Sequence, residues 1–296
     1  MCMGIKEVFS NSWEITKTTF HVMKEDKELI WYPILASVFS LLFILVLLVP
    51  TLIASILAGQ VQIFGFFEYL AFFVIYFGLA FIATFFNVCV VYTAKKRFAG
   101  GDAKFMETLG FALSKIHLIA MWSLLAATVG ILLRGLENMA RKSKGVGAIV
   151  LHILRGVLGM AWAIVTIFVV PAMVYDNLTP FDAIKKSIQV LKKTWGESLV
   201  RHFGLGAIQG AISMAIIVPA CIVGFLMFLT GNFIALIVLI MITVILVILI
   251  GMVFGVANSI FNTALYEYAA NGKVPGGYNK DMLSHAFINK KKSKVL

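Results

Sequence analysis

The chain has 296 residues, of which 61% are hydrophobic and only 13% are charged, whereas soluble domains carry about 25% charged residues. Its mean hydropathy is +0.97, and no Asp, Glu, Lys or Arg occurs between Arg201 and Glu267, although a membrane span needs only about 20 such residues. These values exclude an ordinary soluble domain and predict an all-α, polytopic membrane protein. The net charge of +11 is divided among separate segments, which does not favour nucleic-acid binding.

Residues 1–28 are expected to form a cytoplasmic amphipathic arm, residues 29–272 a six-span membrane domain, and residues 273–296 a cytoplasmic polybasic tail. The expected spans are 33–57, 67–94, 114–134, 148–175, 203–229 and 233–266. The sixth run of about 34 residues is longer than a hydrocarbon core of about 30 Å requires. We expect it to tilt, to break near Gly251 and Gly255, or to continue beyond the bilayer.

The Lys and Arg residues predict the orientation of these spans. Twenty of the 25 lie in the N-terminal arm, the connections 95–115 and 176–201, and the C-terminal tail. By the positive-inside rule, both termini are expected in the cytoplasm, with the anionic inner leaflet of the cell membrane as a partner. The opposite side is expected to carry short loops, including a basic loop at 135–147 and a tight turn at 230–232.

The segment between the fourth and fifth spans reads as a basic surface helix. Thr179, Pro180 and Asp182 fit the N-cap, N1 and N3 positions of a capping box. One face then carries an apolar stripe ending in Trp195, and the other carries Lys185, Lys186, Lys192 and Lys193. The stripe comprises Phe181, Ile184, Ile188, Leu191 and Trp195. This pattern is typical of a helix at an anionic membrane surface, although a soluble amphipathic helix is the alternative.

The chain also shows internal repetition. Spans two, four and six end in Val90-Val91-Tyr92, Met173-Val174-Tyr175 and Ala264-Leu265-Tyr266. Each ending is followed by a turn and an amphipathic segment that starts with an aromatic residue: Phe105, Phe181 or Tyr278. We therefore expect three tandem units of surface helix plus hairpin, followed by a short final helix as a cap. A chance match of three apolar hairpins is the alternative.

Polar groups within the spans are costly in lipid and are therefore candidates for function. Asn258 and Asn262 share one helix face, and with Asn87 and Glu68 they could line a polar path for a solute or ion. The alternatives are interhelical hydrogen bonds for the asparagines and headgroup water for Glu68. Glu267, at the end of span six, is a candidate gate or the ion-pair partner of a lysine.

The sequence offers little for catalysis or for cofactors. His117, His152 and His202 are isolated from one another, whereas a metal site needs three or four converging ligands. No nucleophile triad, phosphate-binding loop or dinucleotide fingerprint is present, so we expect no enzyme, no cofactor and no metal. The three cysteines are far apart and show no CxxC spacing, which argues against a disulfide framework.

Two motifs carry a family resemblance. They are Pro171-x-x-Val174-Tyr175-Asp176 with Pro180-x-x-Ala183-Ile184-Lys185-Lys186-Ser187, and Ala264-Leu265-Tyr266-Glu267-Tyr268-Ala269 with Gly272-x-Val274-Pro275. The chain resembles uncharacterised prokaryotic six-span membrane proteins catalogued as domains of unknown function. It is also distantly similar to the membrane domain attached to some glycerophosphodiester phosphodiesterases. The resemblance implies six helices with cytoplasmic surface helices, and no activity.

Two functions follow as hypotheses. The first is a homo-oligomeric channel or transporter-like passage for a small solute or ion, which uses the asparagines. The second is a non-conducting membrane organiser that binds lipid or partner proteins through its basic surface helices.

Overall fold

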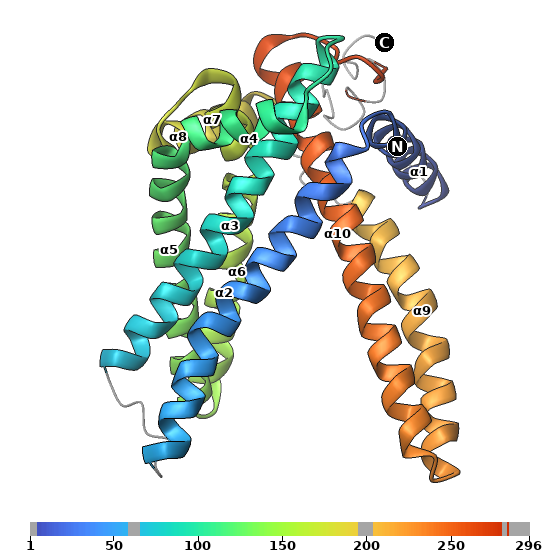
Figure 1. Cartoon of the computed structure of the whole chain (residues 1–296). Helices are drawn as coiled ribbons and strands as arrows, with labels where there is room; N and C mark the ends of the chain where they lie inside the picture. Colours follow the sequence, from blue (N-terminus) through green and yellow to red (C-terminus); the bar gives the residue numbers. More distant parts are fainter. Residues whose placement is uncertain (1–4, 59–65, 195–203, 280–282, 284–296) are drawn as a thin grey trace. The chain divides into compact units, whose positions relative to one another are not determined.

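The computed structural model describes residues 5–58, 66–194, 204–279 and 283, and all regular structure in these residues is helical. The helices are labelled in Figure 1. They are α1 Ile5–Glu25, α2 Glu28–Ala58, α3 Phe66–Phe98, α4 Phe105–Ser114, α5 Ile116–Lys142, α6 Val146–Val165, α7 Val169–Asp176, α8 Pro180–Thr194, α9 Gly204–Leu229 and α10 Phe233–Asn271. The all-helical prediction is confirmed.

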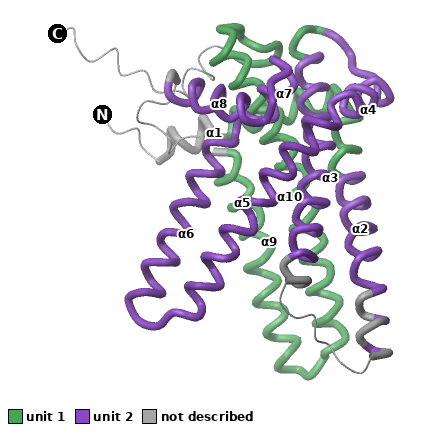
Figure 2. Tube along the Cα trace, turned by 90° about the vertical axis from the view of Figure 1, so that its left-hand side faces the viewer, with its two compact units in different colours: residues 1–33, 98–100, 193–296 green, residues 34–97, 101–192 purple. Residues whose placement is uncertain are grey.

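The chain divides into two compact units, which are coloured separately in Figure 2. Unit 1 comprises residues 1–33, 98–100 and 193–296, and unit 2 comprises residues 34–97 and 101–192. Unit 1 therefore contains α1, α9 and α10, and unit 2 contains most of α2 and α3 together with α4 to α8. Each unit is described by itself.

In unit 2, the short helices α4, α7 and α8 lie at one end of the long helices α3, α5 and α6 (Figure 1). The antiparallel helices α5 and α6 pack against each other, and the rings of Trp122 and Trp162 stack between them at 5.7 Å. At the other end of this pair, Glu137 receives ion pairs from Arg141 at 3.2 Å and from Arg155 at 3.0 Å. The guanidinium of Arg134 lies 3.9 Å from the ring centre of Phe72.

Two predicted boundaries in unit 2 are wrong. The third span continues as helix to Lys142, so most of the predicted loop 135–147 is helical. This extension is stabilised because Glu137 and Arg141 pair across one helical turn. The fourth span is not one helix: it breaks after Val165 and restarts at Val169.

In unit 1, α9 and α10 form an antiparallel hairpin, and α1 packs against both of them. The turn between them places Gly231 at φ +70°, and the Asn232 side chain caps α10 by accepting from the Ala235 N–H at 3.2 Å. The sixth span is one continuous helix, Phe233–Asn271, so it does not break at Gly251 or Gly255.

The segment after α10 fixes α1. The hydroxyls of Tyr278 and Thr19 lie 2.9 Å apart and are buried. Because the single hydroxyl hydrogen of Thr19 is donated to the Ile15 carbonyl, Tyr278 donates to Thr19. Burial raises the pKa of the Tyr278 phenol, which keeps this donor protonated. Tyr278 itself directly follows a turn and is not helical, contrary to the short final helix predicted to start at this residue, of which only Leu283 is described as helical.

Six helical segments in the described residues are long and apolar enough to span a membrane. The prediction of six apolar helical segments of spanning length is confirmed. The most apolar windows of α9 and α10 contain no buried residue, and Ile234 is 80% exposed. A helix that is apolar all round needs an apolar environment, and bare apolar surface of this extent fits lipid and not water. The molecule is a multi-pass membrane protein.

Candidate functional site

The best-defined polar arrangement in unit 2 surrounds α8, the predicted surface helix. The predicted N-terminal cap is confirmed: the Asp182 N–H donates to Thr179 Oγ1 at 3.4 Å, and the Thr179 hydroxyl donates to Asp182 Oδ2 at 2.7 Å. These contacts and Lys185 hold the pKa of the Asp182 carboxyl below its ordinary value, with the Thr179 hydroxyl as the larger cause. Asp182 therefore remains an anion at the positive end of the helix dipole.

The Ser187 side chain of α8 bonds to the break between α6 and α7. At the break, the Ile167 N–H donates to the Ile164 carbonyl and the Val169 N–H to the Thr166 carbonyl, which interrupts the regular helical pattern. The Ser187 hydroxyl donates to the Val165 carbonyl at 2.6 Å, and its oxygen accepts from the Phe168 N–H at 3.4 Å. Ser187 is fully buried, so α8 completes the backbone hydrogen bonding of the interrupted span.

The packed face of α8 differs from its apolar stripe. Ala183, Ser187 and Val190 are buried, and at about 100° per residue they lie together on one side. The predicted stripe begins about a quarter turn away, where Phe181 is 62% exposed and Ile184 and Ile188 are half-buried. Of the four stripe residues whose burial is described, Phe181 is therefore the exposed one, and Leu191, which lies next to the packed face, is buried.

The lysines of α8 fall into different environments. Lys185 and Lys192 are exposed, on the flank of the stripe away from the packed face. Lys185 pairs with Asp182 at 3.3 Å and Lys186 with Asp176 at 3.7 Å. Nothing is described for the Lys193 side chain, and Trp195 lies outside the described residues.

Basic residues from the end of α3 are held at the same end of unit 2. Lys95 Nζ donates to the Val174 carbonyl of α7 at 3.2 Å and lies 4.6 Å from the ring centre of Tyr175. Lys96 Nζ lies 2.7 Å from Glu107 Oε1 of α4, and the Tyr92 hydroxyl donates to the same carboxylate at 2.8 Å. The start of the basic connection 95–115 therefore contacts the end of α7, directly before the basic connection 176–201.

The electrostatics of this end are consistent with an ordered, mainly cationic surface. Lys96, followed by Tyr92, holds the pKa of the Glu107 carboxyl below its ordinary value. Lys115 Nζ donates to Asn177 Oδ1 at 2.7 Å, and Asn177 ends α7 in a left-handed conformation with φ 52°. Glu107 and Asn177 thus orient Lys96 and Lys115.

Sequence reasoning missed the roles of Ser187 and of Lys95. The role of Ser187 could have been predicted from its spacing: it lies four residues after Ala183, so that the two small residues share one face of α8. For Lys95, the signal was the repeated Tyr endings of spans two and four, which are now seen to share one end of unit 2.

The predicted polar-path residues are distributed over both units. In unit 1, Asn258 is exposed and Asn262 half-buried, one turn apart on α10. The Oδ1 atom of Asn262 is buried and has no hydrogen-bond partner among the described residues. Asn87 lies half-buried on α3 in unit 2. Glu68 belongs to α3 and its side chain is not described, while Glu267 is half-buried near the end of α10. The path and the gate stay predictions.

Within the described ranges, no three His, Cys, Asp or Glu side chains converge as a metal site would require.

Residues 66–276 match a family described as a family of unknown function, DUF6159. No curated protein and no solved structure gives a significant match. None of these findings ties the chain to the membrane domains of glycerophosphodiester phosphodiesterases.

Proposed function

Because the chain belongs to the DUF6159 family, to which no function is assigned, we propose a function from its own residues. The protein is a non-conducting organiser of the cell membrane that binds the anionic inner leaflet through α8. Both termini and the lysine-rich end of unit 2 lie on the cytoplasmic side, as the positive-inside rule predicts.

The observation that carries this proposal is the separation of two faces on α8. The side chains of Ala183, Ser187 and Val190 attach the helix to its own unit. This attachment leaves a second apolar face, led by the exposed Phe181, beside Lys185 and Lys192. An apolar stripe flanked by lysines is the arrangement of a helix that lies in the membrane interface, with the lysine stems extended toward the headgroups.

The fixed position of α8 favours specific lipid binding over a loose electrostatic attraction. A lysine near an anionic surface contributes roughly 1 kcal/mol, which is about a fivefold preference for anionic lipid. Since Ser187 holds the helix in place before lipid binds, little ordering of the helix opposes this gain.

The test is the lipid selectivity of the purified protein in bilayers of phosphatidylcholine and phosphatidylglycerol. Spin-labelled lipids of each class report which one is enriched at the protein surface. We expect the wild type to favour phosphatidylglycerol and the double variant Lys185→Gln, Lys192→Gln to lose most of this preference. The combined loss should be tenfold or more, from roughly 1 kcal/mol per lysine.

The matched control is the double variant Lys142→Gln, Lys144→Gln. It removes the same charge from exposed lysines at the other end of the α5–α6 pair. It should keep the selectivity of the wild type at the α8 side. If both double variants lost the preference for phosphatidylglycerol equally, the preference would depend only on the net charge of the protein. That result would contradict the proposal.

A second candidate function is supported by Asn262. Its buried amide oxygen lacks a partner in the described part of the chain, and an unpaired polar atom at membrane depth is costly. The second candidate is a homo-oligomeric passage for a small solute or ion that uses Asn258 and Asn262 of unit 1. Gly206, Gly210 and Gly255 have open space where a side chain would begin, which leaves room for a second copy to approach.

Flux through liposomes tests the passage. If the protein conducts, flux of small cations or anions should exceed that of protein-free liposomes and should drop in the double variant Asn258→Leu, Asn262→Leu. Absence of flux in the wild type would eliminate this second candidate and leave the organiser.

A further inference from the structure

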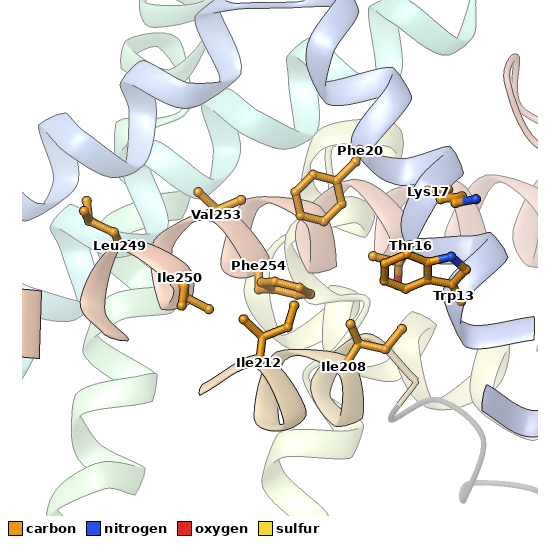
Figure 3. Close-up of a pocket in the computed structure, with 10 residues that line it drawn as sticks. All are labelled: Trp13, Thr16, Lys17, Phe20, Ile208, Ile212, Leu249, Ile250, Val253 and Phe254. Atoms are coloured by element: carbon orange, nitrogen blue, oxygen red, sulfur yellow. The ribbon is translucent and has the colours of Figure 1, made fainter. Parts of the chain in front are cut away.

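Unit 1 contains an apolar cavity of about 450 Å³ between α1 and the α9–α10 hairpin (Figure 3). This volume is in the range of small-molecule sites, about 300–1,000 Å³. The lining residues are Trp13, Thr16, Lys17 and Phe20 of α1, Ile208 and Ile212 of α9, and Leu249, Ile250, Val253 and Phe254 of α10. Lys17 is the single charged residue in this lining.

The cavity has two chemically different ends. Figure 3 shows Trp13 and Lys17 at one end and Leu249 at the other, with Phe20 and Phe254 between them. The Lys17 ammonium lies 5.8 Å from the centre of the Trp13 ring. Tryptophan and lysine are residues of the membrane interface, whereas Leu249 belongs to the uncharged part of α10.

Part of the cavity lining is exposed. Ile208 and Phe254 are buried, whereas Trp13, Ile212 and Leu249 are 46%, 37% and 48% exposed. The cavity therefore opens along the side of two helices that are candidate membrane spans. An apolar opening at this depth faces lipid, since the bilayer core contains no water to fill it.

The arrangement of α1 keeps the cavity open. The buried hydrogen bond between Thr19 and Tyr278 and the edge-to-face contact of Phe20 with Phe254, at 5.4 Å, attach the C-terminal half of α1 to the unit. Trp13, nearly two turns before Phe20, is 46% exposed. The cavity thus lies beside the anchored half of α1, at the side of the hairpin.

We propose that this cavity binds one acyl chain of an anionic phospholipid, with the phosphate headgroup beside Lys17 and Trp13 and the chain directed toward Leu249. The apolar lining selects a hydrocarbon chain, and the cation at the interfacial end selects a negatively charged headgroup. This site lies in unit 1 and does not depend on the proposed role of α8.

The test is native mass spectrometry of the full-length protein released from nanodiscs that contain equal amounts of phosphatidylglycerol and phosphatidylcholine. The wild type should retain one phospholipid per chain, mainly phosphatidylglycerol. Ile250→Trp and, independently, Ile212→Trp fill the cavity and should remove the retained lipid. Ile248→Trp adds the same indole to an exposed position of α10 outside the cavity and should retain it.

Charge is tested by Lys17→Gln against Lys24→Gln, an exposed lysine of the same helix that does not line the cavity. Lys17→Gln should keep one bound lipid and lower the preference for phosphatidylglycerol about fivefold, while Lys24→Gln should leave the preference unchanged. Retention of lipid by both cavity-filling variants would overturn the proposal. So would equal effects of the two lysine variants, or a lipid-free wild type. These results are independent of Lys185 and Lys192, so the two proposals fail separately.

Discussion

The helices α1 and α8 are both amphipathic and both carry lysines, yet the two units use them differently. In unit 2, α8 is attached through small side chains and the buried Ser187 hydroxyl, which forms hydrogen bonds with the backbone at the break between α6 and α7. In unit 1, α1 is attached through the Thr19–Tyr278 hydrogen bond and leaves a cavity beside it. Similar helical patterns therefore give a tightly packed surface helix in one unit and one wall of a cavity in the other.

The difference lies in the residues that face the spans. Ala183 and Ser187 are small, so α8 approaches the α6–α7 break closely and leaves its large apolar residues on another side. The side of α1 that lines the cavity carries Trp13, Thr16 and Phe20, and the edge-to-face contact of Phe20 with Phe254, at 5.4 Å, attaches α1 to α10. The close contacts of α8 are thus made by small side chains, whereas α1 is attached by an aromatic ring beside a cavity.

The largest effect on stability is expected from Ser187→Ala, which removes the hydroxyl that attaches α8. The Val165 carbonyl would then be buried without its partner, which costs about 1–3 kcal/mol. The free energy of unfolding, measured in mixed micelles with increasing SDS, should fall by this amount. Thr128→Ala removes a hydroxyl that bonds only to its own helix, at Leu124, and should change stability by less than about 0.5 kcal/mol. A Ser187→Ala variant as stable as Thr128→Ala would show that α8 is not attached in this way.

A smaller effect is expected from Tyr278→Phe in unit 1. The substitution keeps the ring and removes the hydrogen bond to Thr19, worth about 1 kcal/mol. Amide hydrogen exchange in α1 should accelerate about fivefold, while exchange in α8 should not change. Tyr175→Phe, in unit 2, serves as the control and should leave α1 at its wild-type rate. Unchanged exchange in Tyr278→Phe would mean that α1 is held by its apolar contacts alone.

The smallest effect is expected from Glu107→Gln, and it depends on pH. Because Lys96 and Tyr92 lower the folded-state pKa of Glu107 from its ordinary 4.5, the carboxylate adds stability above pH 4.5. This contribution is lost as the pH falls through the lowered pKa. The thermal midpoint of the wild type should therefore exceed that of Glu107→Gln at pH 7, and the two should converge in more acidic buffer. A difference that grew on acidification would contradict the assigned ion pair.

The sequence was sufficient to predict the elements that depend on local chemistry. The spans followed from uncharged runs, and the start of α8 followed from Thr179 and Asp182. The break after Val165 was not predictable from that span, because its stabilising partner, Ser187, lies 22 residues later and on another helix. The packed face of α8 was not predicted, because the sequence signal lay in the stripe of large residues, whereas the close approach is made by the small residues Ala183 and Ser187. The cavity depends on how α1 meets α9 and α10, which are far apart in sequence.

If α8 lies in the membrane interface, Phe181 enters the bilayer while Gln189 faces water. Nitroxide labels at Phe181→Cys and at Gln189→Cys, with the native cysteines replaced by alanine, report this directly in anionic bilayers. We predict that the label at 181 collides more with oxygen than with a water-soluble nickel chelate, and that the label at 189 shows the reverse. Equal accessibility of both labels to the nickel chelate would contradict the account.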